Sequence, residues 1–336
     1  MREEEVAAYL QHKMPDAREI EVSQLSRIPG GASRETWSFD ANWREGKARP
    51  DGRASRAFIL RRDPEASLLE TERYVEFRVY QALQDSDVPV PEMFWLENDA
   101  QWLQRPFFIM GRLPGEASPQ ALVAGPADKL ETIAQQKTEI LARIHALDWQ
   151  ALGLDFLDAP DGPDGCADHE IGRWEGIMRE QALEPQPILE LGIAWLRAHK
   201  PGAQRMTIVH ADYRTGNFLV HGDRINGVLD WEMVHLGDPL EDVGWACLRS
   251  WRWAGDARIG GLLSRAEWYR RYGEASGTSV DEAAVKFWEV LGNVKLAVIF
   301  LTGARSFAEG RSKDAVHAFT AHLNPEIETE ILRLID

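Results

Sequence analysis

The stretch from Ile208 to Val220 reads Ile-Val-His-Ala-Asp-Tyr-Arg-Thr-Gly-Asn-Phe-Leu-Val, and Val228-Leu-Asp-Trp-Glu232 follows shortly after it. Polar residues come at the ends of short apolar runs in both segments: His210, Asp212, Asn217 and Asp230. The end of a rigid strand is a good place to hold a reacting group in fixed geometry. Polar groups on this spacing therefore predict a site for chemistry and not a simple β-turn.

These residue types suit the transfer of a phosphoryl group to a hydroxyl. Such a transfer needs an acceptor hydroxyl aligned with the γ-phosphate and metal ions that neutralise the phosphate oxygens. Asp212 can orient the hydroxyl and accept its proton, and Arg214 can stabilise the transferring phosphoryl group. Asn217 and Asp230 offer the hard oxygen ligands that Mg²⁺ prefers. We expect His210 to order the loop.

The same segment resembles a known catalytic loop. Protein kinases carry His-Arg-Asp with Asn five residues after the Asp, and a later Asp-Phe-Gly whose Asp binds metal. Here Ala211 replaces the Arg, and Leu229-Asp230-Trp231 stands in the place of Asp-Phe-Gly. With these two changes the segment resembles the aminoglycoside phosphotransferase and choline kinase family, and in particular its bacterial branch known as the phosphotransferase family.

This resemblance implies an α+β, protein-kinase-like fold of two lobes. Residues 1–110 would form a β-rich nucleotide-binding lobe with one main helix, and residues 111–115 would form the hinge. Residues 116–336 would form a mostly helical lobe for catalysis and substrate binding. The resemblance also implies ATP as phosphate donor, Mg²⁺ as cofactor and a small-molecule hydroxyl as acceptor.

The spacing of apolar residues agrees with a β-rich first part and a helical second part. In the first part it predicts helices at 3–13 and 65–83 and strands within 21–62, at 93–96 and at 106–110. In the second part it predicts a β island at 206–229 among helices at 127–147, 168–183, 187–199, 240–250, 264–273, 281–306 and 313–334.

The family resemblance also places a nucleotide site in the first part. A glycine-rich turn containing Gly30, Gly31 and Ser33 would approach the phosphates with its backbone amides. Arg61 stands where the family usually has the Lys that contacts the phosphates. Its partner would be Glu76, with Glu72 as second choice. At the strand and hinge, Met110 and Arg112 would contact the adenine through main-chain groups.

Two aspartates downstream of Asp230 are expected to have structural and not catalytic roles. The stretch from Gly237 to Trp245 resembles the same family. In that fold an aspartate such as Asp242 ties the catalytic loop down through its backbone amides. Asp238 is expected to cap the helix that begins near Pro239. Glu232 would either join the metal shell or face solvent.

Composition and charge exclude several classes of protein. The formal net charge of −16 disfavours general nucleic-acid binding and attachment to an anionic membrane. The longest apolar run, 296–301, is too short to span a bilayer, and the acidic start at 1–6 is unlike a signal peptide. The two cysteines do not form a disulfide framework or zinc pattern, so we expect a cytoplasmic location. The sequence does not predict the oligomeric state.

The acceptor stays open between two chemical classes. An aminoglycoside or other amino alcohol would suit nearby acidic residues, for which the candidates are Glu232, Glu241 and Asp256. A hydroxyacyl-CoA would want a basic patch, for which the candidates are Arg249, Arg252 and Arg258.

Two other activities are weighed against a small-molecule kinase. A non-catalytic nucleotide-binding protein is favoured only by Arg61, and the complete set Asp212, Asn217 and Asp230 opposes it. A protein kinase proper is opposed by Ala211 and by the lack of an Ala-Pro-Glu segment after Asp230.

Overall fold

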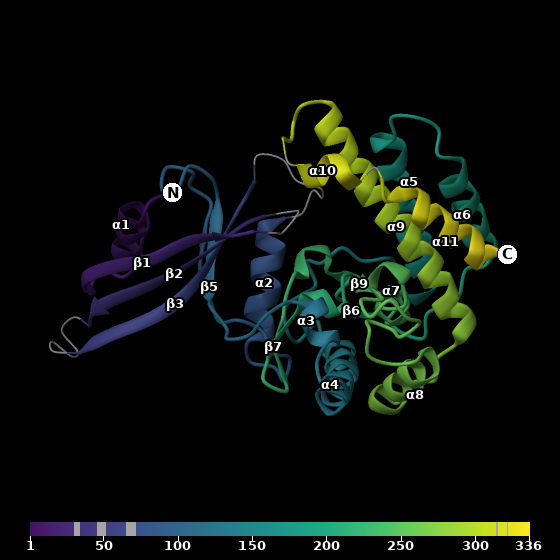
Figure 1. The fold of residues 1–336 in the computed structure, drawn as a ribbon, viewed down its shortest axis with the longest axis horizontal. Coiled ribbons are helices and arrows are strands. Elements are labelled where there is room, and N and C mark those ends of the chain that lie inside the picture. Colours follow the sequence, from purple (N-terminus) through teal and green to yellow (C-terminus); the bar gives the residue numbers. More distant parts are fainter. Residues whose placement is uncertain (30–33, 46–51, 65–71, 314, 321) are drawn as a thin grey trace.

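The structure is a computed structural model that describes residues 1–29, 34–45, 52–64, 72–313, 315–320 and 322–336. The predicted phosphate-loop residues Gly30, Gly31 and Ser33 lie outside this set. The chain folds into two lobes of different character, a sheet with two helices and a larger helical body (Figure 1). The protein-kinase-like architecture expected from the sequence is confirmed.

The first lobe is built on a five-stranded antiparallel sheet in the order β1-β2-β3-β5-β4. The strands are β1 (Arg18–Ile28), β2 (Glu35–Arg44), β3 (Arg53–Arg62), β4 (Met93–Glu97) and β5 (Phe107–Gly111), and the helices are α1 (Glu3–Lys13) and α2 (Arg73–Leu83). Phe58 and Leu60 pack in one core with Tyr9 of α1, whereas Ile59 packs in another with Phe77 of α2. Because side chains alternate along a strand, Arg61 points to the α2 face with Ile59.

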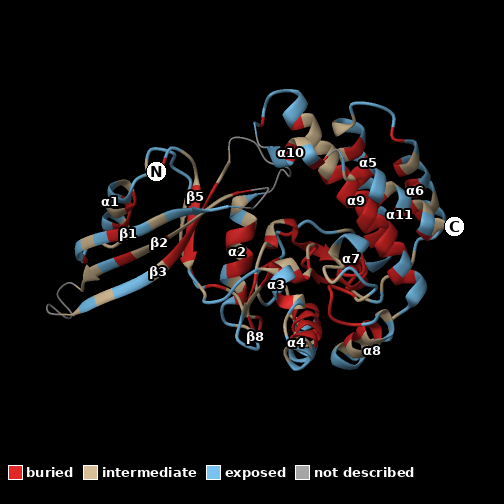
Figure 2. Cartoon of the chain, viewed as in Figure 1, coloured by how far each residue is buried: buried red, intermediate tan, exposed pale blue. Residues whose placement is uncertain are grey.

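The second lobe surrounds one long helix. Its helices are α3 (Pro119–Val123), α4 (Ala127–Ala146), α5 (Cys166–Gln181), α6 (Pro187–Ala198), α7 (Leu240–Trp245), α8 (Arg265–Ser276), α9 (Glu282–Ala308), α10 (Ala315–Thr320) and α11 (Asn324–Ile335). Helix α9 contacts α5, α6, α7, α10 and α11 and is buried along most of its length (Figure 2). A helix buried on all sides needs apolar residues all round, which α9 has. None of the described helices combines the length and apolar character needed to cross a bilayer.

Two helix predictions need correction. The expected helix 313–334 is two helices, because Pro325 opens a new first turn at α11, a position that proline favours. The expected helix 240–250 ends at Trp245. The pattern also missed the five-residue helix α3.

Two short antiparallel two-stranded sheets in the second lobe carry the loop that the sequence singled out. Strand β6 (Thr207–Val209) pairs with β9 (His235–Gly237), and β7 (Phe218–His221) pairs with β8 (Arg224–Val228). The loop that contains Asp212 therefore lies between β6 and β7, and Asp230 follows β8 directly. These strand ends bring the two carboxylates to one side of the lobe.

Candidate active site

The loop after β6 is held in an uncommon backbone shape by groups beneath it. Ala211 has a φ of 66°, a left-handed conformation that non-glycine residues adopt only when their surroundings impose it. The Asp242 carboxylate accepts the amides of His210 and Ala211, both at 2.8 Å. The buried ammonium of Lys295 donates to the Ala211 carbonyl at 2.8 Å. The anchoring role expected for Asp242 is confirmed.

Charged and polar neighbours keep Asp242 ionised. His145 Nε2 lies 3.1 Å from the Asp242 carboxylate, deep in the second lobe. Burial alone would raise the pKa of Asp242, but His145 and the loop amides outweigh it and hold the pKa below its usual range. Asp238 also has a structural place, since its carboxylate accepts the Leu240 amide at the start of α7 and the indole N–H of Trp288.

Three donors fix the carboxylate of Asp212. Oδ1 accepts from Arg214 Nε and from the Trp245 indole, both at 2.9 Å, and Oδ2 accepts from Asn217 Nδ2 at 2.6 Å. An ionised carboxylate offers about four acceptor positions. One position therefore remains, and it lies on Oδ2, which has the single donor.

His210 orders this loop, as the sequence predicted. Its Nε2 donates to the Leu229 carbonyl at 2.9 Å, and its Nδ1 accepts from the Asp212 amide at 3.2 Å. Burial lowers the pKa of His210, so the neutral ring is favoured. The imidazole thus ties the loop after β6 to the strand that leads to Asp230.

An ion-pair chain crosses from the first lobe to the second. Arg61 on β3 meets Glu76 on α2 at 2.5 Å and Asp230 at 2.8 Å, and Arg34 meets the other oxygen of Glu76 at 2.9 Å. Glu76 is fully buried, whereas Glu72, the second choice, is exposed. The structure thus gives Arg61 the partner that the sequence predicted. Their role toward a nucleotide stays a prediction.

Asp230 is held in place through its backbone as well as its side chain. It has a φ of 61°, and its amide donates to the buried Tyr80 hydroxyl at 3.1 Å. Burial alone would raise the pKa of Asp230, but Arg61 and Arg214 outweigh it and lower the pKa. The carboxylate is therefore charged and one-third exposed at a strand end, as an oxygen ligand for a metal must be.

Of the two residues predicted to contact adenine, Met110 lines the cleft and Arg112 does not. Met110 is buried on β5 and lines the cleft between the lobes. The Arg112 amide donates to the Ala57 carbonyl at 3.0 Å, and its guanidinium pairs with Asp40 at 2.6 Å. The predicted adenine contact of Arg112 would therefore have to use its carbonyl oxygen.

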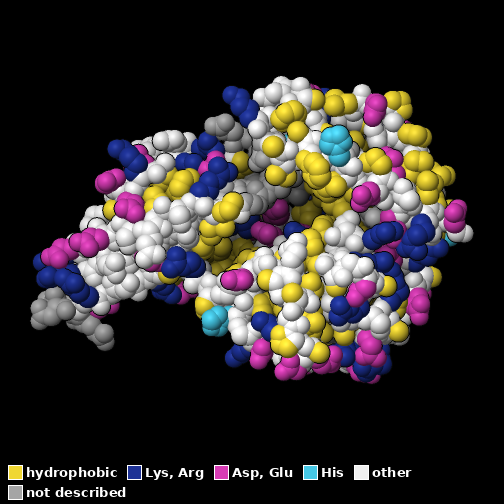
Figure 3. All heavy atoms as spheres, viewed as in Figure 1, with side chains coloured by type: hydrophobic (Ala, Val, Ile, Leu, Met, Phe, Trp, Pro, Cys, Tyr) yellow, Lys and Arg dark blue, Asp and Glu magenta, His cyan; other side chains and the backbone are white. Residues whose placement is uncertain are grey.

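The cleft between the lobes has a volume of about 640 Å³ and brings several of the predicted site residues together, although Glu76 and Arg112 do not line it. Figure 3 shows this hollow, with charged and hydrophobic side chains around it. Its lining includes the predicted site residues Arg61, Met110, Asp212, Arg214, Asn217 and Asp230, together with Glu232. Glu232 is half-buried there and helps to raise the pKa of Arg61.

The part of the cleft beyond Asp212 is aromatic and aliphatic. The ring centroids of Trp245, which donates to Asp212, and Trp251 are 5.6 Å apart. The Arg214 guanidinium carbon lies over the Trp251 ring, 4.8 Å from its centroid. The wall continues with apolar side chains of η3 (Trp231–Met233), α9 and α10: Met233, Leu296, Ile299, Phe300 and Val316. Among the described residues, the acidic side chains that line the cleft are Asp212, Asp230 and Glu232.

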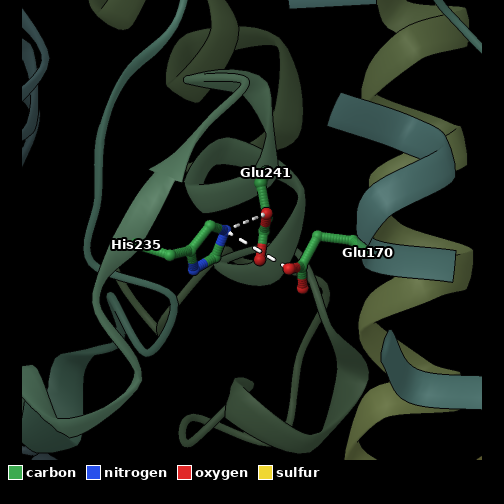
Figure 4. Close-up of side chains that lie close together, drawn as sticks. All are labelled: Glu170, His235 and Glu241. Atoms are coloured by element: carbon green, nitrogen blue, oxygen red, sulfur yellow. Dashed lines mark hydrogen bonds and ion pairs between the residues drawn. The ribbon is translucent and has the colours of Figure 1, made fainter. Parts of the chain in front are cut away.

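Glu241 and Asp256, two candidates for binding an amine, do not line this cleft. Glu241 is buried and contacts His235 Nε2 at 3.0 Å (Figure 4). Its carboxylate also lies 3.4 Å from the Lys295 ammonium. Asp256 is exposed and binds the amide and guanidinium of Arg258. Arg258 pairs with Asp256 at 2.8 Å, whereas Arg252 and Arg249 each lie 3.9 Å from a carboxylate, that of Glu289 and that of Glu330. The Arg249 side chain is 70% exposed.

Glu241 belongs to a buried ionic cluster beneath the catalytic loop, formed with Glu170, His235 and Lys295. His235 also donates from Nδ1 to the Met233 carbonyl at 3.0 Å. Burial alone would lower the pKa of His235, but the two carboxylates outweigh it and raise the pKa to about 9. Two cations then balance two anions. Because Lys295 already lies against Glu241, the cluster is complete as an ionic support and does not call for a metal ion.

Residues 24–288 match the model of a protein family described as the phosphotransferase enzyme family. The chain belongs to this phosphotransferase family. The geometry of the cleft residues is consistent with that membership.

Curated relatives of this phosphotransferase carry two kinds of name. Mouse acyl-CoA dehydrogenase family member 10 is 34% identical over 201 residues, which are 58% of this chain and 18% of that protein. Human acyl-CoA dehydrogenase family member 11 is 28% identical over 244 residues, which are 69% of this chain and 31% of that protein. Hygromycin-B 4-O-kinase of Escherichia coli is 24% identical over 66% of this chain and 61% of its own length. The phosphotransferase thus spans less than a third of those two dehydrogenase relatives.

Solved structures share the whole fold. A Ralstonia eutropha protein assigned to the aminoglycoside phosphotransferases superposes with a TM-score of 0.75 at 23% identity, covering 99% of this chain and 97% of that one. Aminoglycoside phosphotransferase APH(4)-Ia, in a ternary complex with AMP-PNP and hygromycin B, gives 0.63 at 20% identity with 98% of both chains covered. These likenesses establish the fold.

Reasoning from sequence missed several residues that build the site. Trp245 and Tyr80 contribute an N–H and a hydroxyl oxygen, and neither carries a motif that marks such a role. Lys295 did have a signal, because it is a lone charge within the apolar stretch from Val290 to Leu301. A charged residue is buried only with partners, so a polar contact was to be expected there.

Proposed function

We propose that this phosphotransferase moves the γ-phosphoryl group of Mg²⁺-bound ATP to a hydroxyl on the acyl chain of a hydroxyacyl-CoA. The observation that carries the acceptor assignment is the wall of the cleft beyond Asp212. It is formed by indole, phenyl and aliphatic side chains, which suit an apolar chain. A polycationic aminoglycoside would want carboxylates there instead.

Asp212 acts on the acceptor. The hydroxyl donates to the remaining position on Oδ2, which fixes the oxygen in line with the γ-phosphorus. As the new oxygen–phosphorus bond forms, the bond to the β–γ bridging oxygen breaks and ADP departs. The hydroxyl proton passes to Asp212, and Arg214, 2.9 Å from that carboxylate, offers its remaining N–H groups to the phosphoryl oxygens.

Asn217 and Asp230 fit the ligand role for Mg²⁺. Asn217 donates through Nδ2 to the carbonyl and carboxylate oxygens of Asp212, so its own Oδ1 is the atom left for a cation. Asp230 is ionised at the edge of the cleft. Bound metal would supply charge neutralisation on the phosphate oxygens. Arg61 would add a fixed cation, since it is held by Glu76, whose other oxygen pairs with Arg34.

The names of the curated relatives support the acceptor class. The mouse and human relatives are named as acyl-CoA dehydrogenases, and this chain matches a part of each. A kinase that shares a chain with an acyl-CoA enzyme has a chemical reason to act on acyl-CoA. The hygromycin kinase relative keeps the amino-sugar acceptor as the second candidate, with Glu232 as its acidic contact.

The test is ADP release with Mg²⁺ and ATP on a panel of acceptors, with product mass measured for each. The panel contains hydroxyacyl-CoAs of increasing chain length, hygromycin B, choline and simple sugars. We expect phosphorylation of the hydroxyacyl-CoAs and a mass gain of one phosphoryl group. Phosphorylation of hygromycin B with no activity on any hydroxyacyl-CoA would contradict the acceptor assignment and leave the phosphotransferase reaction in place.

A further inference from the structure

A second hollow lies directly beyond the apolar wall of the cleft. It has a volume of about 690 Å³, similar to that of the cleft itself. Trp251, Leu296 and Phe300 line both hollows. A molecule that reaches Asp212 with one end can therefore continue past these three side chains with the other.

The lining of the second hollow is more polar than that of the cleft beyond Asp212. It includes the hydroxyls of Ser250 and Thr329, the amide of Asn293 and the carboxylates of Glu326 and Glu330. The Arg333 guanidinium pairs with Glu330, and its charge outweighs the effect of burial and lowers the pKa of that carboxyl. These polar groups can bind amides and hydroxyls, and they stand beside the apolar side chains of Trp253, Leu323 and Ile327.

Arg249 adds a cation to this hollow. Its side chain is 70% exposed, and it lies 3.9 Å from Glu330, a separation that leaves its N–H groups available. Two carboxylates inside the hollow would repel a phosphate placed deep within it. An anion is accommodated only near the exposed arginine, at the outer side.

We propose that the second hollow holds the pantetheine arm of the hydroxyacyl-CoA, with the CoA phosphates near Arg249. The inference rests on the function proposed above and specifies where each part of the acceptor lies. The acyl chain stays in the apolar cleft, the arm with its amides and hydroxyl crosses Trp251, and the phosphates remain outside. Three regions of the site thus match three chemically different parts of one acceptor.

The test compares one hydroxyacyl group on two carriers, coenzyme A and N-acetylcysteamine, which lacks most of the arm and all phosphates. Two variants address the hollow: Ser250→Trp fills it from an exposed position, and Arg249→Ala removes the cation. We expect each to raise the KM for the CoA thioester about tenfold, equivalent to about 1.4 kcal/mol. Neither should change kcat/KM for the N-acetylcysteamine thioester. Ser279→Trp, at an exposed position outside the hollow, is the matched control and should change neither substrate.

Equal effects of the hollow variants on both thioesters, or no effect on either, would overturn the placement of the arm while leaving the proposed function intact. Dependence of the effect on acyl-chain length alone would also overturn it, because the hollow would then hold the acyl end. Phosphorylation of neither thioester by the unmodified protein would overturn the proposed function and this inference with it.

Discussion

Asp212 is the residue that accepts the proton of the acceptor hydroxyl in the proposed reaction. Two donors on Oδ1 and one on Oδ2 set its orientation and leave a single acceptor position. This arrangement gives the carboxylate a defined proton-accepting atom. An amide at the same position would keep the shape and lose the base.

We therefore predict that Asp212→Asn lowers kcat by about 10²- to 10⁴-fold, the usual contribution of a positioned general base. The measurement is ADP release at saturating ATP and acceptor, with circular dichroism to verify the fold. Asp256→Asn is the matched control, since that exposed carboxylate lies outside the cleft. Full activity of Asp212→Asn would remove this residue from the mechanism.

Arg61 allows a second prediction at this scale. Its Nη1 alone contacts both Glu76 and Asp230, so a lysine ammonium can reproduce part of the contact. We expect Arg61→Lys to keep measurable turnover, reduced about 10- to 100-fold because one charge-assisted hydrogen bond is lost. Arg61→Met removes the charge and should be far less active. Equal activities of the two variants would show that the charge of Arg61 is not what the site uses.

At the scale of elements, the strands and helices hold the catalytic loop from below. Asp242 of α7 receives two loop amides, and Lys295 of α9 reaches the Ala211 carbonyl. The left-handed backbone at Ala211 depends on these contacts. The loop is therefore stable only while α7 and α9 remain packed against it.

Removal of the Asp242 carboxylate tests this support. Asp242→Ala leaves two buried amides and His145 without their acceptor, which we expect to cost about 3 kcal/mol or more of unfolding free energy. Urea denaturation measures the loss. Asp242→Asn should be milder, because its amide oxygen still accepts one bond. A stability equal to that of the unmodified protein for Asp242→Ala would contradict the anchoring role.

The buried cluster of Glu170, His235, Glu241 and Lys295 predicts a pH dependence of stability. The folded pKa of His235 is about 9, above the usual 6.5 or so of an unfolded chain. Protonated His235 thus contributes its full stabilisation to the folded state when the pH is below the unfolded pKa. This contribution declines as the pH rises toward the folded pKa. From pH 7 to 8 we expect a loss of about 1 kcal/mol.

The measurement is urea denaturation at pH 7.0, 7.5 and 8.0. His235→Gln should show a flatter dependence over that range, whatever its absolute stability. Lys137, with a folded pKa lowered to about 8 by burial, acts in the opposite sense as pH approaches and passes 8. Both proteins contain Lys137, so the difference between their slopes reports on His235. Parallel slopes for the two proteins would show that His235 is not the cation of the cluster.

At the scale of the whole molecule, a few polar residues were enough to predict the core of the site, and the family resemblance that they carry predicted the fold. The set His210, Asp212, Asn217 and Asp230 falls on strand ends, and such positions are visible in sequence because apolar runs precede them. Polar residues that follow an apolar run in the sequence are therefore found at strand ends in the folded chain. The family resemblance likewise paired Arg61 with Glu76 of α2, and the structure shows that contact.

Long-range contacts were not predictable in the same way. Tyr80 lies 150 positions from Asp230, and Lys295 lies 84 from Ala211, so no local pattern connects them. The acceptor wall joins parts of η3, α7, α9 and α10 that only the packing around α9 brings together. The second hollow is a product of that same packing.

Arg61 of the first lobe meets Asp230 of the second, so the proposed binding of a metal-bound nucleotide would act on this contact. The direct measurement is the affinity for a non-hydrolysable ATP analogue with and without Mg²⁺, by calorimetry, in the unmodified protein, Asp230→Asn and Asp212→Asn. We predict that Mg²⁺ strengthens binding in the unmodified protein and in Asp212→Asn, and that Asp230→Asn loses the enhancement. Retention of the full Mg²⁺ effect in Asp230→Asn, or its loss in Asp212→Asn, would contradict the division of roles between the two carboxylates.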